Sequence, residues 1–226
     1  MRPLPLMLFA AGFGARMGAL TAHHPKPMIE VAGKALIDHA LAVADQAGIA
    51  KIVINLHYLG DQIASHVQHR DIALSWEPEI LETGGGLKAA LPLLGDGPVL
   101  TMNTDAVWSG QNPLTQLLNA WDPEEMDALL LLLPASKALG HIGAGDFLLD
   151  AEGRLSRANQ TDSPIYLGAQ ILKTGGLQAI SERVFSLNRL WDRLIAERRA
   201  YGIIHQGGWC DVGRPEGIAL AESLHV

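Results

Sequence analysis

Two glycines and an arginine stand close together near the start of the chain, in the sequence Gly12-Phe-Gly14-Ala-Arg16, directly after an apolar run. Because glycine has no side chain, its backbone N–H groups can close around a phosphate where a strand ends. The guanidinium of Arg16 would add positive charge there. This spacing predicts a phosphate-binding loop, and a tight turn without a ligand is the alternative that two glycines alone leave open.

Two well-known phosphate motifs do not match this loop. A Walker loop needs Gly-Lys followed by Ser or Thr, which is absent. The dinucleotide fingerprint needs a third glycine at position 17 and an acidic residue after the second strand, but the chain has Met17 and Asn55. A dinucleotide-dependent oxidoreductase is therefore excluded.

A single lysine, Lys26, lies between Pro25 and Pro27. A residue that precedes a proline is pushed toward extended conformations, so this lysine sits on a stiffened segment. A lysine on a stiff segment suits fixed anion binding, whereas an exposed lysine in a turn is the alternative.

Two aspartates end apolar stretches far apart in the sequence. Asp105 follows the run 99–103, and Asp211 follows Trp209 and Cys210. One or two carboxylates, with water and phosphate oxygens, are the usual protein ligands of Mg²⁺ at nucleotide sites. We therefore expect Asp105 and Asp211 to form a metal pair, although either one alone could simply cap the next turn.

Three further segments carry glycines that could admit a ligand. The string Glu-Thr-Gly-Gly-Gly at 82–86 is expected to precede a helix, where backbone groups could contact a flat base, or to form a flexible loop. Asp146 follows Gly145 at a predicted hairpin, where Gly-Asp is also good turn chemistry. Gly168 lies in a predicted strand and allows close approach of a ligand or marks a bulge.

The elements that must position these residues alternate along the first half of the chain. Apolar runs typical of strands occupy 4–10, 51–55, 72–76, 99–103 and 128–133, and amphipathic stretches typical of helices occupy 36–47, 61–69, 87–94 and 114–121. A hairpin at 146–158, a strand at 166–172 and helices at 187–198 and 215–224 follow. This order predicts an α/β fold, a Rossmann-like three-layer sandwich with a mostly parallel mixed sheet, whose ligands bind beyond the carboxyl ends of the strands.

Composition narrows the class of protein further. The 226 residues are 48% hydrophobic and 18% charged, which suits one globular domain, and 17 basic against 24 acidic residues give a net charge of −7. No basic run offsets this balance, so neither nucleic acid nor a membrane surface is expected as a partner. One cysteine excludes an intramolecular disulfide, and we expect a cytoplasmic protein.

A longer pattern resembles the signature of sugar-1-phosphate nucleotidyltransferases, which make nucleotide sugars. It consists of Gly12-x-Gly14-x-Arg16-Met17, Leu20-Thr21, Pro25-Lys26-Pro27-Met28 and Val31-x-Gly33-Lys34. The resemblance implies transfer of a nucleotide from a nucleoside triphosphate to a sugar 1-phosphate, with Mg²⁺ as cofactor. The family usually shows Asn-Gly-Asp where this chain has Asn103-Thr104-Asp105, which puts the local backbone geometry in question.

The resemblance also implies a set of site residues. Arg16, Lys26, Asp105 and Asp211 would carry catalysis, with the two aspartates holding Mg²⁺. The nucleotide would be bound by Ala11, Gly12, Gly14, Ala15, Arg16, Lys26, Glu82, Thr83, Gly84 and Gly85. The sugar would be bound by Asn103, Asp146, Asn159 and Gly168.

The string Leu-Glu-Thr-Gly-Gly-Gly at 81–86 is similar to that of one branch, the bacterial N-acetylmuramate 1-phosphate uridylyltransferases of cell-wall recycling. The resemblance then implies UTP and N-acetylmuramate 1-phosphate as substrates and pyrophosphate as a product. We expect residues 1–226 to be a single nucleotidyltransferase domain without an appended β-helix domain, acting as a monomer or small homo-oligomer.

Other functions stay open at this point. The same chemistry serves mannose 1-phosphate with GTP, glucose 1-phosphate with UTP or dTTP, and phosphocholine with CTP. A non-catalytic nucleotide-sensing protein could keep the fold, but it would be expected to lose its carboxylates or its loop lysine. This chain keeps Arg16, Lys26, Asp105 and Asp211.

Overall fold

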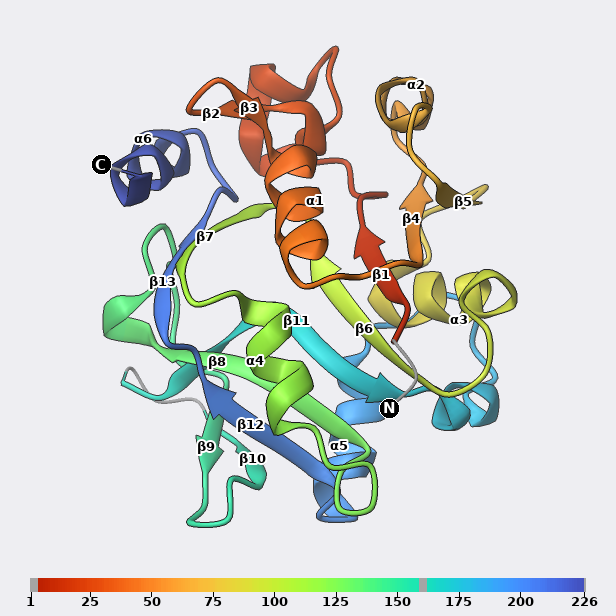
Figure 1. Cartoon of the computed structure of the whole chain (residues 1–226), viewed down its shortest axis with the longest axis vertical. Coiled ribbons are helices and arrows are strands. Elements are labelled where there is room, and N and C mark those ends of the chain that lie inside the picture. The colour runs from red at the N-terminus through yellow and green to blue at the C-terminus, as the bar shows by residue number, and fades with distance from the viewer. Residues whose placement is uncertain (1–3, 159–161, 226) are drawn as a thin grey trace.

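A seven-stranded sheet forms the centre of the molecule in the computed structural model, which describes residues 4–158 and 162–225 (Figure 1). Its strands, in spatial order, are β12 (Ala200–Ile204), β8 (Ala128–Pro134), β11 (Pro164–Lys173), β6 (Pro98–Asn103), β1 (Leu6–Phe9), β4 (Ile52–Leu56) and β5 (Ile72–Trp76). Only β11 runs antiparallel to its neighbours in this sheet. The predicted mostly parallel mixed sheet is confirmed.

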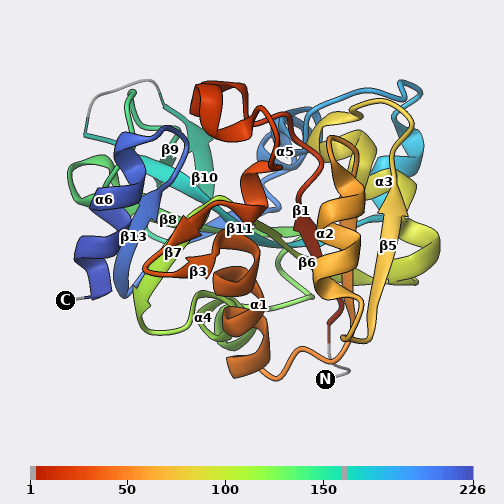
Figure 2. The same ribbon diagram turned by 90° about the horizontal axis from the view of Figure 1, so that it is seen from above.

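Helices cover both faces of the sheet, as a three-layer sandwich requires (Figure 2). The helices on one face are α1 (Leu36–Gln46), α2 (Gly60–Val67) and α4 (Pro113–Ala120), and those on the other are α3 (Glu82–Leu94) and α5 (Asn188–Ala196). Side chains alternate along each strand, so Leu6 and Leu8 enter the first core and Met7 enters the second. Strand β8 is apolar and buried along nearly its whole length, as expected for a strand covered on both faces.

In the described part of the chain, three small two-stranded sheets lie outside the central one. They pair β2 (Glu30–Val31) with β3 (Lys34–Ala35), β9 (Phe147–Leu149) with β10 (Leu155–Arg157), and β7 (Ala106–Gly110) with β13 (Gly207–Asp211). The helix α6 (Glu216–Glu222) follows β13. Short 3-10 turns complete the chain at η1 (Ala15–Thr21), η2 (Lys26–Met28), η3 (Ala135–Lys137), η4 (Gly175–Ala179) and η5 (Ser223–His225).

The predicted hairpin at 146–158 is confirmed by β9 and β10, but several features of the structure differ from the expectation. Strand β12 of the central sheet was not predicted. Strand β7, which begins directly after Asp105, was also not predicted, and it pairs Ala106 with Asp211. Helix α3 begins at Glu82, so the string 82–86 is the first part of this helix rather than a segment before it. Within the described residues, no helix is both long enough and apolar enough to cross a membrane.

Candidate active site

A cavity of about 430 Å³ opens at the carboxyl ends of β1, β4, β5 and β6. Among the residues that line it are ten that the sequence analysis assigned to a site: Ala11, Gly12, Gly14, Ala15, Arg16, Lys26, Glu82, Thr83, Asn103 and Asp105. The structure therefore brings the glycine loop, the loop lysine, one aspartate and the start of α3 together. Open α/β sheets place their ligand sites at this edge, because loops leave the strands there.

The two glycines of the loop both line the cavity, but they differ in the space that an added side chain would find. A Cβ placed on Gly12 would meet no atom within 4 Å. Gly14 has a φ of +63°, and a Cβ there would lie 2.9 Å from Lys26 Cβ. Gly14 is thus needed for the left-handed turn and for contact with the lysine stem, whereas Gly12 leaves free space beside the cavity.

The lysine of the Pro-Lys-Pro segment is buried and points at an acid. Lys26 is 8% exposed, and its Nζ lies 2.7 Å from Asp105 Oδ2. Pro27 stands at the start of η2, where the proline ring fits the first turn. The stiff segment predicted from the two prolines thus delivers the lysine to the end of β6.

The second aspartate reaches the same place through the unpredicted ladder of β7 and β13. The backbone N–H of Val212 donates to the carbonyl oxygen of Asp105 over 2.9 Å. A Cβ placed on Gly213 would lie 2.6 Å from Asp211 Oδ2 and 3.1 Å from Arg16 Nη2, so the guanidinium and this carboxylate flank the same glycine. Gly213 itself lines the cavity.

Burial and the neighbouring charges act in opposite directions on Asp211. Burial raises the pKa of its carboxyl above the ordinary aspartate value, and the charge of Asp105 raises it further. Lys26, Arg16 and His141 partly offset this rise in pKa. Two neighbouring carboxylates beside a cavity are a donor set that suits a hard divalent cation with additional oxygen ligands.

Thr104 stands where the family usually has glycine, and the structure gives it a definite contact. Its side chain is buried, and its hydroxyl donates to the carbonyl oxygen of Phe9 over 2.8 Å. This bond joins the end of β6 to the end of β1, just before the glycine loop. The threonine therefore holds together the two strand ends that carry Asp105 and Gly12.

Two buried polar residues at the site were missed in the sequence analysis. Asn55 Nδ2 donates to Glu77 Oε1 over 2.7 Å, and Asn55 Oδ1 accepts the N–H of Ala10 over 2.8 Å. The other oxygen of Glu77 accepts the N–H of Leu81 over 3.0 Å. Both side chains line the cavity and join the glycine loop to the start of α3. An asparagine inside the apolar run of β4 was the available signal.

The start of α3 presents side chains to the cavity and uses its glycines for packing. Glu82 and Thr83 line the cavity, and Glu82 has a φ of +58°, a strained value for a residue other than glycine. The N–H groups of Gly84 and Gly85 both donate to the carbonyl oxygen of Phe185. This carbonyl serves N–H groups that the first turn of a helix otherwise leaves without partners.

Residues expected to bind the sugar occupy different positions. Asn103 lines the cavity, and Gly168, with a φ of +83°, makes room for it, because a Cβ there would lie 2.8 Å from Asn103 Nδ2. Asp146 does not line the cavity, and its Oδ2 accepts the N–H of Tyr166 over 2.9 Å. Asn159 lies outside the described residues.

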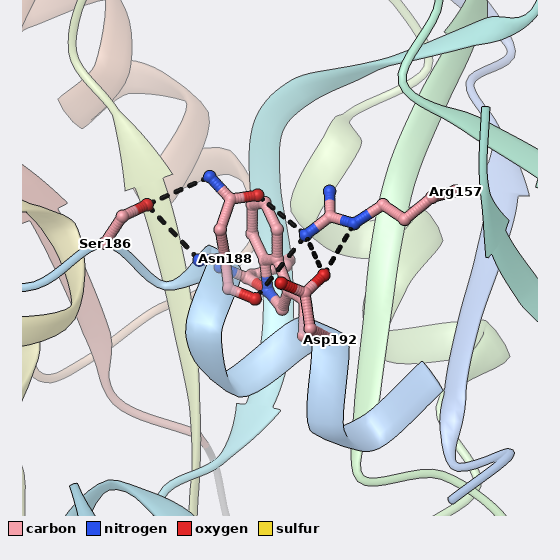
Figure 3. A network of polar contacts seen from close by, with 6 residues as sticks. Arg157, Ser186, Asn188 and Asp192 are labelled. Carbon is pink, nitrogen blue, oxygen red and sulfur yellow. Dashed lines mark hydrogen bonds and ion pairs between the residues drawn. The ribbon is translucent and has the colours of Figure 1, made fainter. Parts of the chain in front are cut away.

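A polar network fastens the hairpin that follows Asp146 to helix α5 (Figure 3). Arg157 Nε donates to Asp192 Oδ1, and Arg157 Nη2 donates to Asn188 Oδ1, each over 2.8 Å. The guanidinium also lies 4.8 Å from the centre of the Phe147 ring, a cation–π contact. The N–H of Leu187, just before α5, donates to Thr83 Oγ1. Hydrogen bonds thus connect the hairpin to α5, and the segment before α5 to the start of α3.

Two solved structures with the same fold were determined as complexes with GMP-PN and with UDP-glucose. HddC from Yersinia pseudotuberculosis complexed with GMP-PN matches with a TM-score of 0.78 at 19% identity, over 99% of this chain and 100% of that one. A UDP-glucose pyrophosphorylase complexed with UDP-glucose matches with a TM-score of 0.77 at 17% identity, over 98% of each chain. These likenesses show that the chain shares its fold with these two proteins.

Sequence comparison gives the family. Residues 6–141 match the MobA-like NTP transferase domain, and the chain belongs to this family. It is 39% identical, over 98% of its length and 96% of the relative's, to an N-acetylmuramate alpha-1-phosphate uridylyltransferase of Caulobacter vibrioides. It is 34% identical, over 96% of each chain, to a protein of the same name from Neisseria meningitidis serogroup B. The resemblance stated from the motifs is confirmed, and the chain is a sugar-1-phosphate nucleotidyltransferase.

Proposed function

We propose that this chain joins UTP to N-acetylmuramate 1-phosphate and releases pyrophosphate. The names of the two relatives that match nearly the whole chain support these substrates. The observation that carries the chemistry is the grouping of Lys26, Asp105, Asp211 and Arg16 at one side of the cavity formed by the glycine loop.

The reaction needs positioned charge more than proton transfer. An oxygen of the sugar phosphate attacks the α-phosphorus of the triphosphate, a new P–O bond forms, and the bond to the leaving pyrophosphate breaks. A phosphate monoester has a second pKa of about 6, so it is a nucleophilic dianion near neutral pH and needs no general base. Catalysis then depends on alignment of the reactants and on stabilisation of the negative charge.

The cationic residues of the site have distinct tasks in this scheme. The open space beside Gly12 receives the phosphates, with Lys26 directed at the α-phosphate and Arg16 at the outgoing pyrophosphate. Asp105 and Asp211 would hold Mg²⁺, which would neutralise phosphate charge and orient the triphosphate when bound. These groups would stabilise the negative charge that develops on the leaving pyrophosphate. The transfer is direct, so no side chain of the protein acts as a nucleophile.

Two further groups of residues would select the nucleobase and the sugar. On the base side, the proposal assigns nucleobase contacts to Glu82 and Thr83, with Glu77 as a buried acceptor behind them, and Gly84 and Gly85 keep these side chains in place. Thr83 Oγ1 already accepts the Leu187 N–H, so its own proton is available for a ligand oxygen. On the sugar side, Asn103 would contact the sugar next to Gly168. The resemblance also implies sugar contacts by Asp146 and Asn159.

We also propose a domain organisation, a compartment and an oligomeric state for the enzyme. Residues 1–226 would act as one nucleotidyltransferase domain in the cytoplasm, as a monomer or small homo-oligomer, on small-molecule substrates rather than on nucleic acid or membranes. The net charge of −7 and the single cysteine support this setting.

A panel of pyrophosphate-release assays with Mg²⁺ tests the function. UTP, CTP, GTP, ATP and dTTP are crossed with the 1-phosphates of N-acetylmuramate, N-acetylglucosamine, glucose and mannose, and with phosphocholine. The highest kcat/KM is expected for UTP with N-acetylmuramate 1-phosphate, and Asp105→Asn should abolish it. A higher kcat/KM for another pair would show that the proposed substrates are wrong. If no pair releases pyrophosphate while the protein still binds UTP, a nucleotide sensor would be favoured.

A further inference from the structure

Lys26 and Asp105 are bound to each other although each is needed by a different ligand of the proposed reaction. Nζ of the lysine lies 2.7 Å from Oδ2 of the aspartate, and both residues line the cavity. The lysine side chain is 10% exposed and the aspartate side chain 31%. A partly buried, charge-assisted bond of this length is stronger than an exposed ion pair, because water screens it less.

The pair belongs to a cluster of acidic and basic side chains. Asp105 and Asp211 supply two carboxylates, and Lys26 and Arg16 supply two cations beside them. Without the cations, the two carboxylates would repel each other in a partly buried place. The carboxylates of the cluster therefore already have cations beside them, and a divalent cation that approached Asp105 would have to compete with the positive charge of Lys26.

We propose that Lys26 is a placeholder cation, which occupies Asp105 in the free protein and exchanges it for the divalent cation when the triphosphate arrives. The proposal rests on the proposed function, because that function assigns Asp105 to the metal and Lys26 to the α-phosphate. It follows that the divalent cation binds weakly to the free protein. The triphosphate gives the lysine a new partner and so opens the carboxylate.

The geometry restricts this exchange to the end of the lysine side chain. The backbone is stiffened by Pro25 and Pro27, and the stem packs against Gly14, since a Cβ there would lie 2.9 Å from Lys26 Cβ. Nζ, in contrast, is a flexible point charge with three donors. Because the glycine loop touches the stem, phosphates bound to the loop lie within a short movement of Nζ.

The test measures Mn²⁺ affinity by electron paramagnetic resonance in the absence of nucleotide, so it does not depend on turnover. Lys26→Met should bind Mn²⁺ about tenfold or more tightly than wild type, because the ion no longer has to break a charge-assisted bond. Lys26→Gln should behave in the same way if the Met variant fails to fold. Lys26→Arg, which keeps the cation, should bind Mn²⁺ as weakly as wild type.

Two control variants distinguish loss of the direct bond between Lys26 and Asp105 from the general effect of removing a positive charge. Lys34→Met removes an exposed charge on β3 and should leave Mn²⁺ affinity unchanged. Arg16→Met removes a cation beside Asp211, and its gain in Mn²⁺ affinity should be clearly smaller than that of Lys26→Met. Equal gains for Arg16→Met and Lys26→Met, or no gain for Lys26→Met and Lys26→Gln, would overturn the proposal.

Failure of this proposal can be told apart from failure of the proposed function. Wild type that releases pyrophosphate while Lys26→Met gains no Mn²⁺ affinity would keep the function and remove the placeholder role. Mn²⁺ binding that survives in Asp105→Asn would show that the ion sits elsewhere, which contradicts the metal assignment on which both proposals depend.

Discussion

The two glycine-rich segments of this protein use the absence of a side chain in opposite ways. Beside Gly12, a Cβ would find no atom within 4 Å, and the residue lines the cavity. At Gly85, a Cβ would lie 2.3 Å from the carbonyl oxygen of Arg183, and the residue is buried. The first segment leaves room for a ligand, whereas the second lets a neighbouring segment of the same chain pack closely.

This difference shows why a run of glycines alone does not identify a ligand site. Both segments are placed near the carboxyl edge of the sheet, and both were expected to contact nucleotide. The N–H groups of Gly84 and Gly85 are taken by Phe185, and the side chains of Glu82 and Thr83 face the cavity instead. An added methyl group would enter free space at Gly12 but would overlap a backbone carbonyl at Gly85. Substitution by alanine should therefore affect the two glycines differently.

The largest effect on stability is expected at the packed segment. Gly85→Ala should lower the free energy of unfolding by about 2–3 kcal/mol, because the new methyl group overlaps a backbone carbonyl that cannot rotate away. Urea denaturation followed by circular dichroism measures this loss.

Gly12→Ala is the matched control for that substitution. It should change the free energy of unfolding by less than about 0.5 kcal/mol, since its methyl group enters free space. It should lower kcat/KM for the triphosphate roughly tenfold or more, because the methyl group occupies room meant for phosphates. Equal loss of stability in both variants would remove the distinction between the segments.

A substitution at Asp211, beside the same cavity as Gly12, should raise the stability of the protein instead of lowering it. Burial, followed by the charge of Asp105, raises the pKa of Asp211 in the folded state, so ionisation of this carboxyl costs stability at neutral pH. Asp211→Asn should therefore raise the Tm at pH 7 while it abolishes turnover.

The pH dependence checks the cause of this gain. The stability difference between Asp211→Asn and wild type should shrink as the pH falls through the raised pKa of Asp211 toward the ordinary aspartate value of about 3.9. A thermal-shift series across this range measures the difference. A variant that is less stable than wild type at pH 7 would contradict the pKa shift.

A smaller loss of stability than that at Gly85 is expected at Glu82, the first residue of α3. Its φ of +58° favours glycine, so Glu82→Gly should be more stable than Glu82→Ala by about 1 kcal/mol. Both variants lack the carboxylate, so the comparison isolates backbone strain. Equal stability in chemical denaturation would show that the strain is absent.

Much of this architecture could be predicted from the sequence, because it depends on local patterns. Alternating apolar runs predicted six of the seven strands of the central sheet and the helices on both faces, but not β12. Gly12, Arg16 and Lys26 lie close together in the chain, so their grouping follows from one loop. Asp105 was placed by the strand that precedes it. These residues all line the cavity.

The rest depends on contacts between distant parts of the chain, which no local pattern encodes. Asp211 reaches the site through pairing of β7 with β13, a ladder between segments about a hundred residues apart. Gly84 and Gly85 are explained by the close packing of Arg183 and Phe185, which also lie about a hundred residues away. Glu77 and Asn55 were missed because their roles arise from buried hydrogen bonds to each other and to the backbone of Ala10 and Leu81.

Amide hydrogen exchange, followed for single residues by NMR with and without UTP and Mg²⁺, tests the central claim most directly. The claim is that the nucleotide phosphates bind at the glycine loop, whereas the glycines of α3 are structural. UTP should slow exchange at Gly12 and Gly14 and leave Gly84 and Gly85, which already donate to Phe185, nearly unchanged. Slower exchange at Gly84 and Gly85 with no change at Gly12 and Gly14 would contradict it.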